Sequence, residues 1–126
     1  MFSEIACYGQ DSTFDDILTT IFISAEQNVN CVALPSGFMG RVVEFLKDQR
    51  FAAVIDFPYG ISTTQVRLHE IILAIRHGAS LIDLVLNGSY LKEENWKKLE
   101  EDLKVCSTVC NENNVTLRPI LEYKLF

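Results

Sequence analysis

One carboxylate interrupts an otherwise aliphatic segment of the chain. Residues 81–87 read LIDLVLN, with Asp83 near the middle. An ionised carboxylate taken out of water is unfavourable unless it is paired or hydrogen-bonded. Because side chains alternate along a strand, Asp83 shares a face with Leu81 and Asn87, while the other face is purely aliphatic. This mixed face suits a cleft or a barrel interior, where Asp83 could act as a general acid or base. The alternative is an Asp83 paired with an arginine or lysine of a neighbouring strand.

Other polar side chains follow apolar strands at their carboxyl ends. Asp56 comes after AAVI, Asn87 after LVL and Glu122 after PIL. In parallel α/β sheets the functional residues collect at this end of the strands. We therefore take Asp56, Asn87 and Glu122 as candidate substrate-binding residues.

The four cysteines show no metal-ligand spacing. Cys106 and Cys110 are four residues apart on a predicted helix and could share a metal, but no histidine lies near them to complete a site. Two small core residues are the simpler interpretation, so we expect no metal and no cofactor. Without a secretory signal, reduced thiols and a cytoplasmic location are expected.

Strand and helix patterns alternate along the whole chain. The periodicity predicts helices at 12–27, 37–47, 62–77 and 92–113, and strands at 28–35, 51–58, 80–87 and 116–123, with a further possible strand within 1–7. We expect Ser12 or Thr13 to cap the first helix, Ser62 and Gln65 to form a capping box, and Gly78 to end that third helix. A parallel sheet with right-handed crossovers follows.

The length of the chain limits the possible folds, and its net charge limits the possible partners. At 126 residues we expect a single domain over 1–126, too short for a complete (β/α)₈ barrel, which needs roughly 200 residues. The net charge of −6 argues against nucleic acid and anionic membranes as partners. No apolar run approaches the roughly 18 residues of a membrane-spanning helix.

The segment VIDFPYGISTTQVRLHEIILAIRHGASLIDLVLN is similar to the central part of deoxyribose-phosphate aldolases. That family carries a GFP-G-TTT-V turn, a helix ending in GA, and then EIDMVIN. Upstream, CVALPSGFMGRVVEFLK resembles the family's proline-ended strand and short helix, and downstream LRPILEY resembles LKVIIET.

The resemblance implies a class I aldolase on a TIM barrel, of which this chain matches the amino-terminal half. The family reaction converts 2-deoxyribose 5-phosphate to glyceraldehyde 3-phosphate and acetaldehyde through a lysine Schiff base, as part of deoxyribonucleotide catabolism. Asp83 matches the family's proton-transfer aspartate, and Glu4 sits where the family has an aspartate. Asp56 replaces a usual glycine or asparagine, which adds negative charge at the mouth of the site.

The Schiff-base lysine belongs to later strands of the family's barrel. Of the lysines present, only Lys124 follows a strand end, and nothing there would hold its amine neutral. Two hypotheses stand: an aldolase-like protein that is inactive as this chain alone, and a noncatalytic assembly or sugar-phosphate-binding relative. A doubly wound binding domain is a weaker third, because no glycine-rich phosphate loop is present.

A partial barrel of four or five strands would leave open edges and an uncovered interior. We expect Val54, Leu81 and Val85 to form an exposed apolar patch there, covered by self-association into a homo-oligomer. Pro119 lacks a ladder donor and fits an edge strand. If the protein is active, its other partner is a small phosphorylated sugar or aldehyde.

Overall fold

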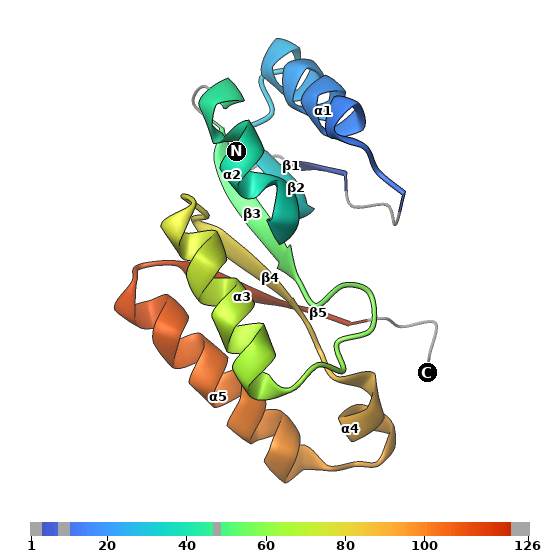
Figure 1. Ribbon diagram of the computed structural model, residues 1–126. Helices are drawn as coiled ribbons and strands as arrows, with labels where there is room; N and C mark the ends of the chain where they lie inside the picture. The colour runs from blue at the N-terminus through green and yellow to red at the C-terminus, as the bar shows by residue number, and fades with distance from the viewer. Residues whose placement is uncertain (1–3, 8–10, 47–48, 122–126) are drawn as a thin grey trace.

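The computed structural model describes residues 4–7, 11–46 and 49–121. Within them, five parallel strands form one open sheet in the order of the sequence (Figure 1). The strands are β1 (Glu4–Ala6), β2 (Cys31–Pro35), β3 (Arg50–Ile55), β4 (Leu81–Val85) and β5 (Thr116–Ile120). The helices are α1 (Phe14–Glu26), η1 (Ser36–Phe38), α2 (Met39–Val42), η2 (Val43–Phe45), α3 (Thr64–Arg76), α4 (Gly88–Lys92) and α5 (Trp96–Glu112). The predicted alternation of strands and helices in a parallel sheet is confirmed.

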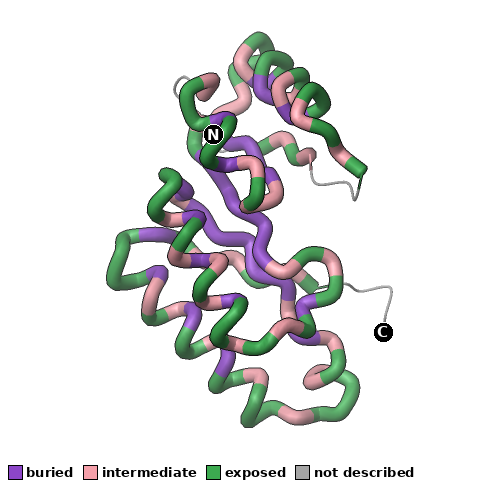
Figure 2. Tube along the Cα trace, viewed as in Figure 1, coloured by how far each residue is buried: buried purple, intermediate pink, exposed green. Residues whose placement is uncertain are grey.

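The main hydrophobic core lies between one face of the sheet and the helices. Ile17 and Ile21 of α1, Ile71 of α3, and Cys106 and Cys110 of α5 are all buried in it. They pack against alternate strand residues, and Figure 2 shows the buried positions running along the strands and the inner sides of the helices. The cysteine pair is thus part of this core, and burial raises the pKa of each thiol to about 11.

The sheet is strongly curved, and its other face is concave. Arg118 of β5 forms an ion pair with Glu4 of β1 at 2.7 Å, although these strands are the two edges of the sheet. In a flat sheet the first and fifth strands would be roughly 19 Å apart, since neighbouring strands are about 4.8 Å apart. Only a curved sheet brings these two side chains together, so β1 to β5 form part of a barrel wall with the helices outside.

The concave face is lined by a second cluster of buried residues. Its members are small or aliphatic: Cys31, Ala33, Ala52, Val54 and Leu81, with Ile120 packed against them. The expectation of an exposed apolar patch is wrong, because Val54, Leu81 and Val85 are only 3, 5 and 1 % exposed. Small side chains on a tightly curved face contact one another, and little of their surface reaches solvent.

Helix caps differ from the sequence expectation at one point. Thr13, one of the two predicted caps, caps α1 and forms a capping box with Asp16. The cap of α3 is Thr63, whose Oγ1 accepts the N–H of Val66. The predicted capping box of Ser62 is wrong, because Ser62 donates both its N–H and its hydroxyl to the Asp56 carboxylate.

The predicted helix 92–113 is two helices in the structure. Glu94 adopts a left-handed backbone with φ 56°, and Asn95 then caps α5 by accepting the N–H of Lys98. Trp96, the first residue of α5, is 57 % exposed. The first buried residue of α5 is Asp102, nearly two turns further along the helix.

β5 is an edge strand among the described residues, and Pro119 sits at its free side. Thr116 donates its N–H to Ser80, and Ile120 accepts the N–H of Leu86, so even-numbered residues of β5 face β4. Leu117 and Pro119 therefore direct their backbone groups away from the sheet. The free edge lacks a donor at Pro119, as the sequence indicated for an edge strand.

None of the helices in the described ranges is long and apolar enough to cross a membrane.

Candidate active site on the concave face

Asp83 lies on the concave face and is bound at both oxygens by Arg118. The two residues are register partners on β4 and β5. Nε of Arg118 donates to Oδ1 of Asp83 at 2.6 Å, and Nη2 donates to Oδ2 at 2.9 Å. The Asp83 side chain is 8 % exposed, while that of Arg118 is 31 % exposed. The concave-face position expected for Asp83 is therefore observed, together with the neighbouring-strand arginine that the alternative interpretation required.

Arg118 links two carboxylates into one cluster. Its Nη1 contacts Oε2 of Glu4 while its other edge holds Asp83. Burial raises the pKa of Asp83 above its ordinary value, the hydrogen bonds and charge of Arg118 lower it, and the charge of Glu4 adds to the rise. Burial alone would lower the pKa of Arg118, but its hydrogen bonds and ion pairs with both carboxylates raise it above the ordinary value. Arg118 is therefore a permanent cation, able to orient a carboxylate but not to act as an amine nucleophile.

Cys31 adjoins this cluster from β2. Its register partner on β1 is Glu4, and it is fully buried. Burial raises the pKa of the Cys31 thiol to about 12, and the charge of Glu4 adds to the rise. Because the thiolate is the reactive form of cysteine, Cys31 is an inert thiol in this setting.

The role of Arg118 in setting the protonation of Asp83 is directly measurable. In Arg118→Met we expect the pKa of Asp83 to rise further, because the cation and the two hydrogen bonds that lower it are removed. A carboxyl whose folded-state pKa lies above its ordinary value stabilises the fold when protonated. The variant should therefore gain stability as the pH falls through that raised pKa, and lose the gain as the pH rises again.

Carboxyl ¹³C NMR against pH gives this pKa, and Arg41→Met is the matched control. Arg41 lies over the Phe14 ring on the helical side, at 4.1 Å from its centroid. An Asp83 pKa that stays constant or falls in Arg118→Met would contradict the assignment.

Asp56 belongs to a second network, at the carboxyl end of β3. Its Oδ2 accepts from Nη1 of Arg67 at 2.7 Å, and Arg67 also binds Asp102 of α5 at 3.1 Å. The guanidinium further donates to the carbonyl oxygens of Gly60 and Val85. The negative charge expected at the mouth from Asp56 is thus paired with a buried arginine on α3, which Asp56 shares with Asp102.

The two remaining sequence candidates are placed differently. Oδ1 of Asn87 accepts the N–H groups of Ser89 and Tyr90, so this oxygen caps α4. Glu122 lies outside the described residues. The structure therefore brings together Asp83 and Glu4, leaves Asp56 in the separate Arg67 network, and commits the amide oxygen of Asn87 to a helix cap.

Sequence reasoning missed the two arginines that organise these networks. Arg118 stands in an apolar strand two residues before its end, a signal as unusual as that of Asp83. Arg67 stands among apolar residues of α3 and is 1 % exposed, and its partners Asp56 and Asp102 come from distant segments. A basic residue inside an apolar stripe is the sequence feature that could have pointed to either one.

A curved parallel sheet with helices outside and charged groups on the concave face defines a partial (β/α) barrel. Comparison with known proteins specifies it further. The family model of DeoC/LacD family aldolases matches residues 5–124, and the chain belongs to this family.

Sequence relatives point the same way. The chain is 35 % identical over 112 residues to a deoxyribose-phosphate aldolase of Mycoplasmopsis pulmonis, covering 87 % of this chain and 50 % of that protein. It is 30 % identical over 112 residues to the deoxyribose-phosphate aldolase of Clostridium botulinum, covering 88 % of this chain and 50 % of the relative. The chain thus spans about half the length of the relatives it matches.

Solved structures share the fold. The tetrameric deoxyribose phosphate aldolase of Aeropyrum pernix superposes with a TM-score of 0.85 at 18 % identity, over 98 % of this chain and 52 % of that one. A protein described as "QR15, an Aldolase" gives a TM-score of 0.86 at 24 % identity, over 96 % of this chain and 54 % of that one.

Proposed function

We propose that this chain is a deoxyribose-phosphate aldolase-like protein whose concave face carries the proton-transfer side of a class I aldolase site. The observation that carries the proposal is the cluster of Asp83, Arg118 and Glu4. Asp83 acts as the general acid or base, and Arg118 fixes the orientation of its carboxylate. The substrate is a small phosphorylated sugar or aldehyde, and the setting is deoxyribonucleotide catabolism in the cytoplasm.

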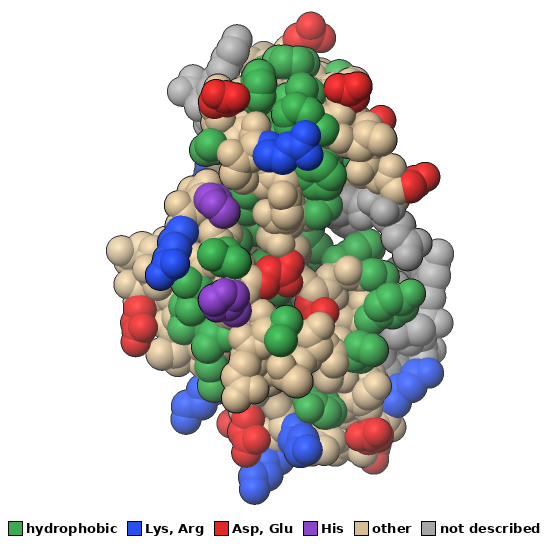
Figure 3. Space-filling model, in the orientation of Figure 1, with side chains coloured by type: hydrophobic (Ala, Val, Ile, Leu, Met, Phe, Trp, Pro, Cys, Tyr) green, Lys and Arg blue, Asp and Glu red, His purple; other side chains and the backbone are tan. Residues whose placement is uncertain are grey.

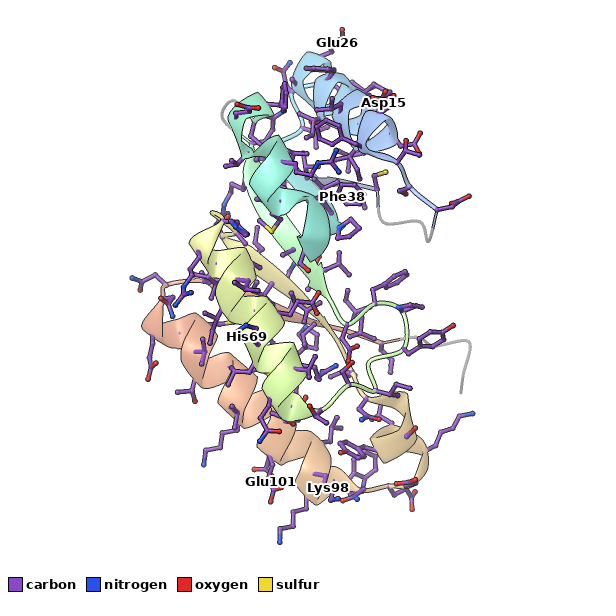
Figure 4. All side chains as sticks on the ribbon, viewed as in Figure 1. Asp15, Glu26, Phe38, His69, Lys98 and Glu101 are labelled. Atoms are coloured by element: carbon purple, nitrogen blue, oxygen red, sulfur yellow. The ribbon has the colours of Figure 1, made fainter. Side chains whose placement is uncertain are left out.

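We also propose that these 126 residues alone do not perform the aldol cleavage. Class I chemistry needs an amine that attacks the substrate carbonyl to form a Schiff base, which then accepts the electron pair of the broken C–C bond as an enamine. This amine must be kept largely neutral by burial or by a nearby cation. The described lysines (Lys92, Lys97, Lys98 and Lys104) are exposed and belong to α4 and α5. Figure 4 shows Lys98 projecting from α5 on the side away from the sheet.

The alternative is a noncatalytic assembly or sugar-phosphate-binding relative. The contact between Arg118 and Asp83 favours this alternative. Arg118 donates to both oxygens of Asp83, whereas a carboxylate that transfers protons needs one oxygen open toward substrate or water. In this case the cluster joins β1 to β5 across the concave face and keeps the sheet curved.

Borohydride trapping tests the catalytic half of the proposal. The chain is incubated with deoxyribose 5-phosphate and borohydride, and the mass of each lysine-containing peptide is measured. We expect no mass increase on any lysine, while the M. pulmonis relative, treated in the same way, serves as the positive control. Trapping that disappears in a single variant such as Lys124→Ala would overturn the proposal, and would identify the amine.

We also propose that the chain self-associates, but through the edges of the sheet and not through the concave face that the sequence indicated. The concave face is already buried, whereas β1 and β5 are open edges among the described residues. The A. pernix relative is tetrameric. We expect light scattering to give a mass that is a multiple of the 14.3 kDa chain. A well-behaved monomer at high concentration would contradict this.

A further inference from the structure

The sheet ends in two unpaired strand edges among the described residues, at β1 and at β5 (Figure 1). Cys7 donates its N–H to a carbonyl of β2, so odd-numbered residues of this segment face β2. Because backbone groups alternate along a strand, those of Glu4 and Ala6 point away from the sheet. The outward groups of β5 belong to Leu117 and Pro119, of which only Leu117 has an N–H. Each edge can therefore pair with one more parallel strand.

The two edges carry opposite charges on the concave face. Glu4 of β1 is the register partner of Cys31, a member of the concave cluster, so its side chain lies on that face. Arg118 of β5 lies on the same face, as the register partner of Asp83. Within one chain these two charges meet at 2.7 Å because both side chains reach across the concave face. The side chain of Glu4 is 26 % exposed and that of Arg118 is 31 % exposed, so a second molecule can contact both.

A second copy of this chain fits both edges at once. A copy rotated about an axis along the strands presents its β1 in the direction in which β5 runs, and its β5 then meets β1 of the first chain. Head-to-tail contacts of this kind close into a ring when the rotation closes, and closure leaves no strand edge open. The length of the chain agrees with such a pair, because the A. pernix aldolase superposes over 98 % of this chain but only 52 % of its own length.

Charge favours the strand edges over the helical face as the contact between copies. The chain carries a net charge of −6, so two copies repel each other overall. Figure 3 shows acidic and basic side chains interspersed over the helical face, with no gathering of either sign among the described residues on the side shown. At a junction of β5 with β1, by contrast, Arg118 of one copy meets Glu4 of the other. The attraction between copies is therefore located at the edges.

We propose that β1 of a second copy pairs with β5 in the register that sets Glu4 of that copy opposite Arg118. Side chains alternate along strands, so only every second register keeps both charges on the concave face, and opposite charges select this one. Five strands from each copy enclose a wider interior than the curve of a single copy, so Arg118 binds Glu4 of the second copy in place of its own. Each Asp83–Arg118 pair is then completed by the other chain. The inference rests on the proposed function and specifies its self-association.

Blocking the β1 edge tests whether the strands pair. Ala6→Pro removes an outward N–H and keeps the N–H groups that face β2, and proline at a free edge prevents further pairing. We expect self-association, measured by sedimentation velocity, to weaken about tenfold, with an unchanged far-UV circular dichroism spectrum. Ala6→Ser keeps the N–H and is the matched control, which should associate like the parent chain. Equal association of all three proteins would overturn edge pairing.

Charge reversal in separate chains tests the register and the residue that the second copy contributes. In Glu4→Arg and in Arg118→Glu, a symmetric pair places like charges opposite each other, so each variant alone should associate about tenfold more weakly. An equimolar mixture restores opposite charges at both junctions, because each chain then meets the complementary charge on the other. Native mass spectrometry separates the mixed pair from both symmetric pairs, and we expect the mixed pair to predominate.

Arg76→Glu and Glu101→Arg are the matched controls, since they reverse the same charges at exposed positions of α3 and α5. Alone or mixed, they should associate as the parent chain does. If a charge variant does not fold alone, a folded mixed pair still supports the register, and Ala6→Pro still tests the edge. Mixed pairs no more abundant than random exchange gives would overturn the register.

Two failures can be told apart. A monomeric parent chain would overturn this inference together with the proposed self-association. An oligomer that is insensitive to Ala6→Pro and to the mixing of charge variants would overturn only the interface described here. Neither result involves a Schiff base, so borohydride trapping decides the aldolase role separately.

Discussion

Replacing Arg67 with alanine should remove about 3 to 5 kcal/mol from the free energy of unfolding, the range found when one partner of a buried ion pair is deleted. The Arg67 side chain is 1 % exposed, and its partners Asp56 and Asp102 are 13 and 5 % exposed. Alanine would leave two carboxylates without their cation. It would also remove the donor from the carbonyl oxygens of Gly60 and Val85. Against a total of about 5 to 15 kcal/mol for a domain, this loss is large.

Urea unfolding followed by far-UV circular dichroism measures the effect. Arg76→Ala is the matched control, because Arg76 is an exposed arginine at the end of the same helix. It should change stability by no more than about 0.5 kcal/mol. A triple variant, Arg67→Met with Asp56→Asn and Asp102→Leu, removes every charge and should recover much of the loss. If Arg67→Ala and Arg76→Ala unfold alike, the network does not stabilise the fold.

The fold could be predicted because each strand is recognisable from its local sequence alone. Near-continuous apolar runs separated by amphipathic helices indicate a parallel sheet, and β2, β4 and β5 lie inside the predicted ranges, while β3 begins one residue before its range. The break between α4 and α5 could not be read in this way. It depends on a left-handed residue at Glu94, which is not a residue type that marks such a backbone, followed by a cap at Asn95.

For a different reason, the sequence predicted Asp83 of the candidate site but not the residues that bind it. Asp83 could be identified because a carboxylate within an aliphatic strand is unusual, however that strand aligns with its neighbours. Its partner Arg118 depends on the alignment of β4 with β5, and the contact between Arg118 and Glu4 depends on the curvature of the whole sheet. The Arg67 network likewise joins the end of β3, α3 and α5, which the sequence keeps far apart. Long-range geometry of this kind is not encoded in local periodicity.

Gly60→Ala should cost about 2 to 4 kcal/mol, because it combines backbone strain with a clash against the main chain. Gly60 has φ 68°, a conformation that favours glycine, and it is buried in the loop between β3 and α3. An added Cβ would lie 2.5 Å from the carbonyl oxygen of Leu86 and 2.9 Å from Cγ1 of Val85. The loop cannot move aside easily, since the N–H of Gly60 donates to the Asp56 carbonyl and its own carbonyl binds Arg67.

Gly37→Ala is the control for this substitution, because an added Cβ at Gly37 would meet nothing within 4 Å. It should alter the free energy of unfolding by about 0.5 kcal/mol or less. Both variants remove a glycine, Gly37 from η1 and Gly60 from the loop before α3, so the loss of flexibility in the unfolded chain is shared and cancels between them. A large difference in urea midpoint would show that the loop cannot relieve the close approach of Gly60 to Val85 and Leu86 at the end of β4. Equal midpoints would mean that the loop can be displaced, and that Arg67 alone positions it.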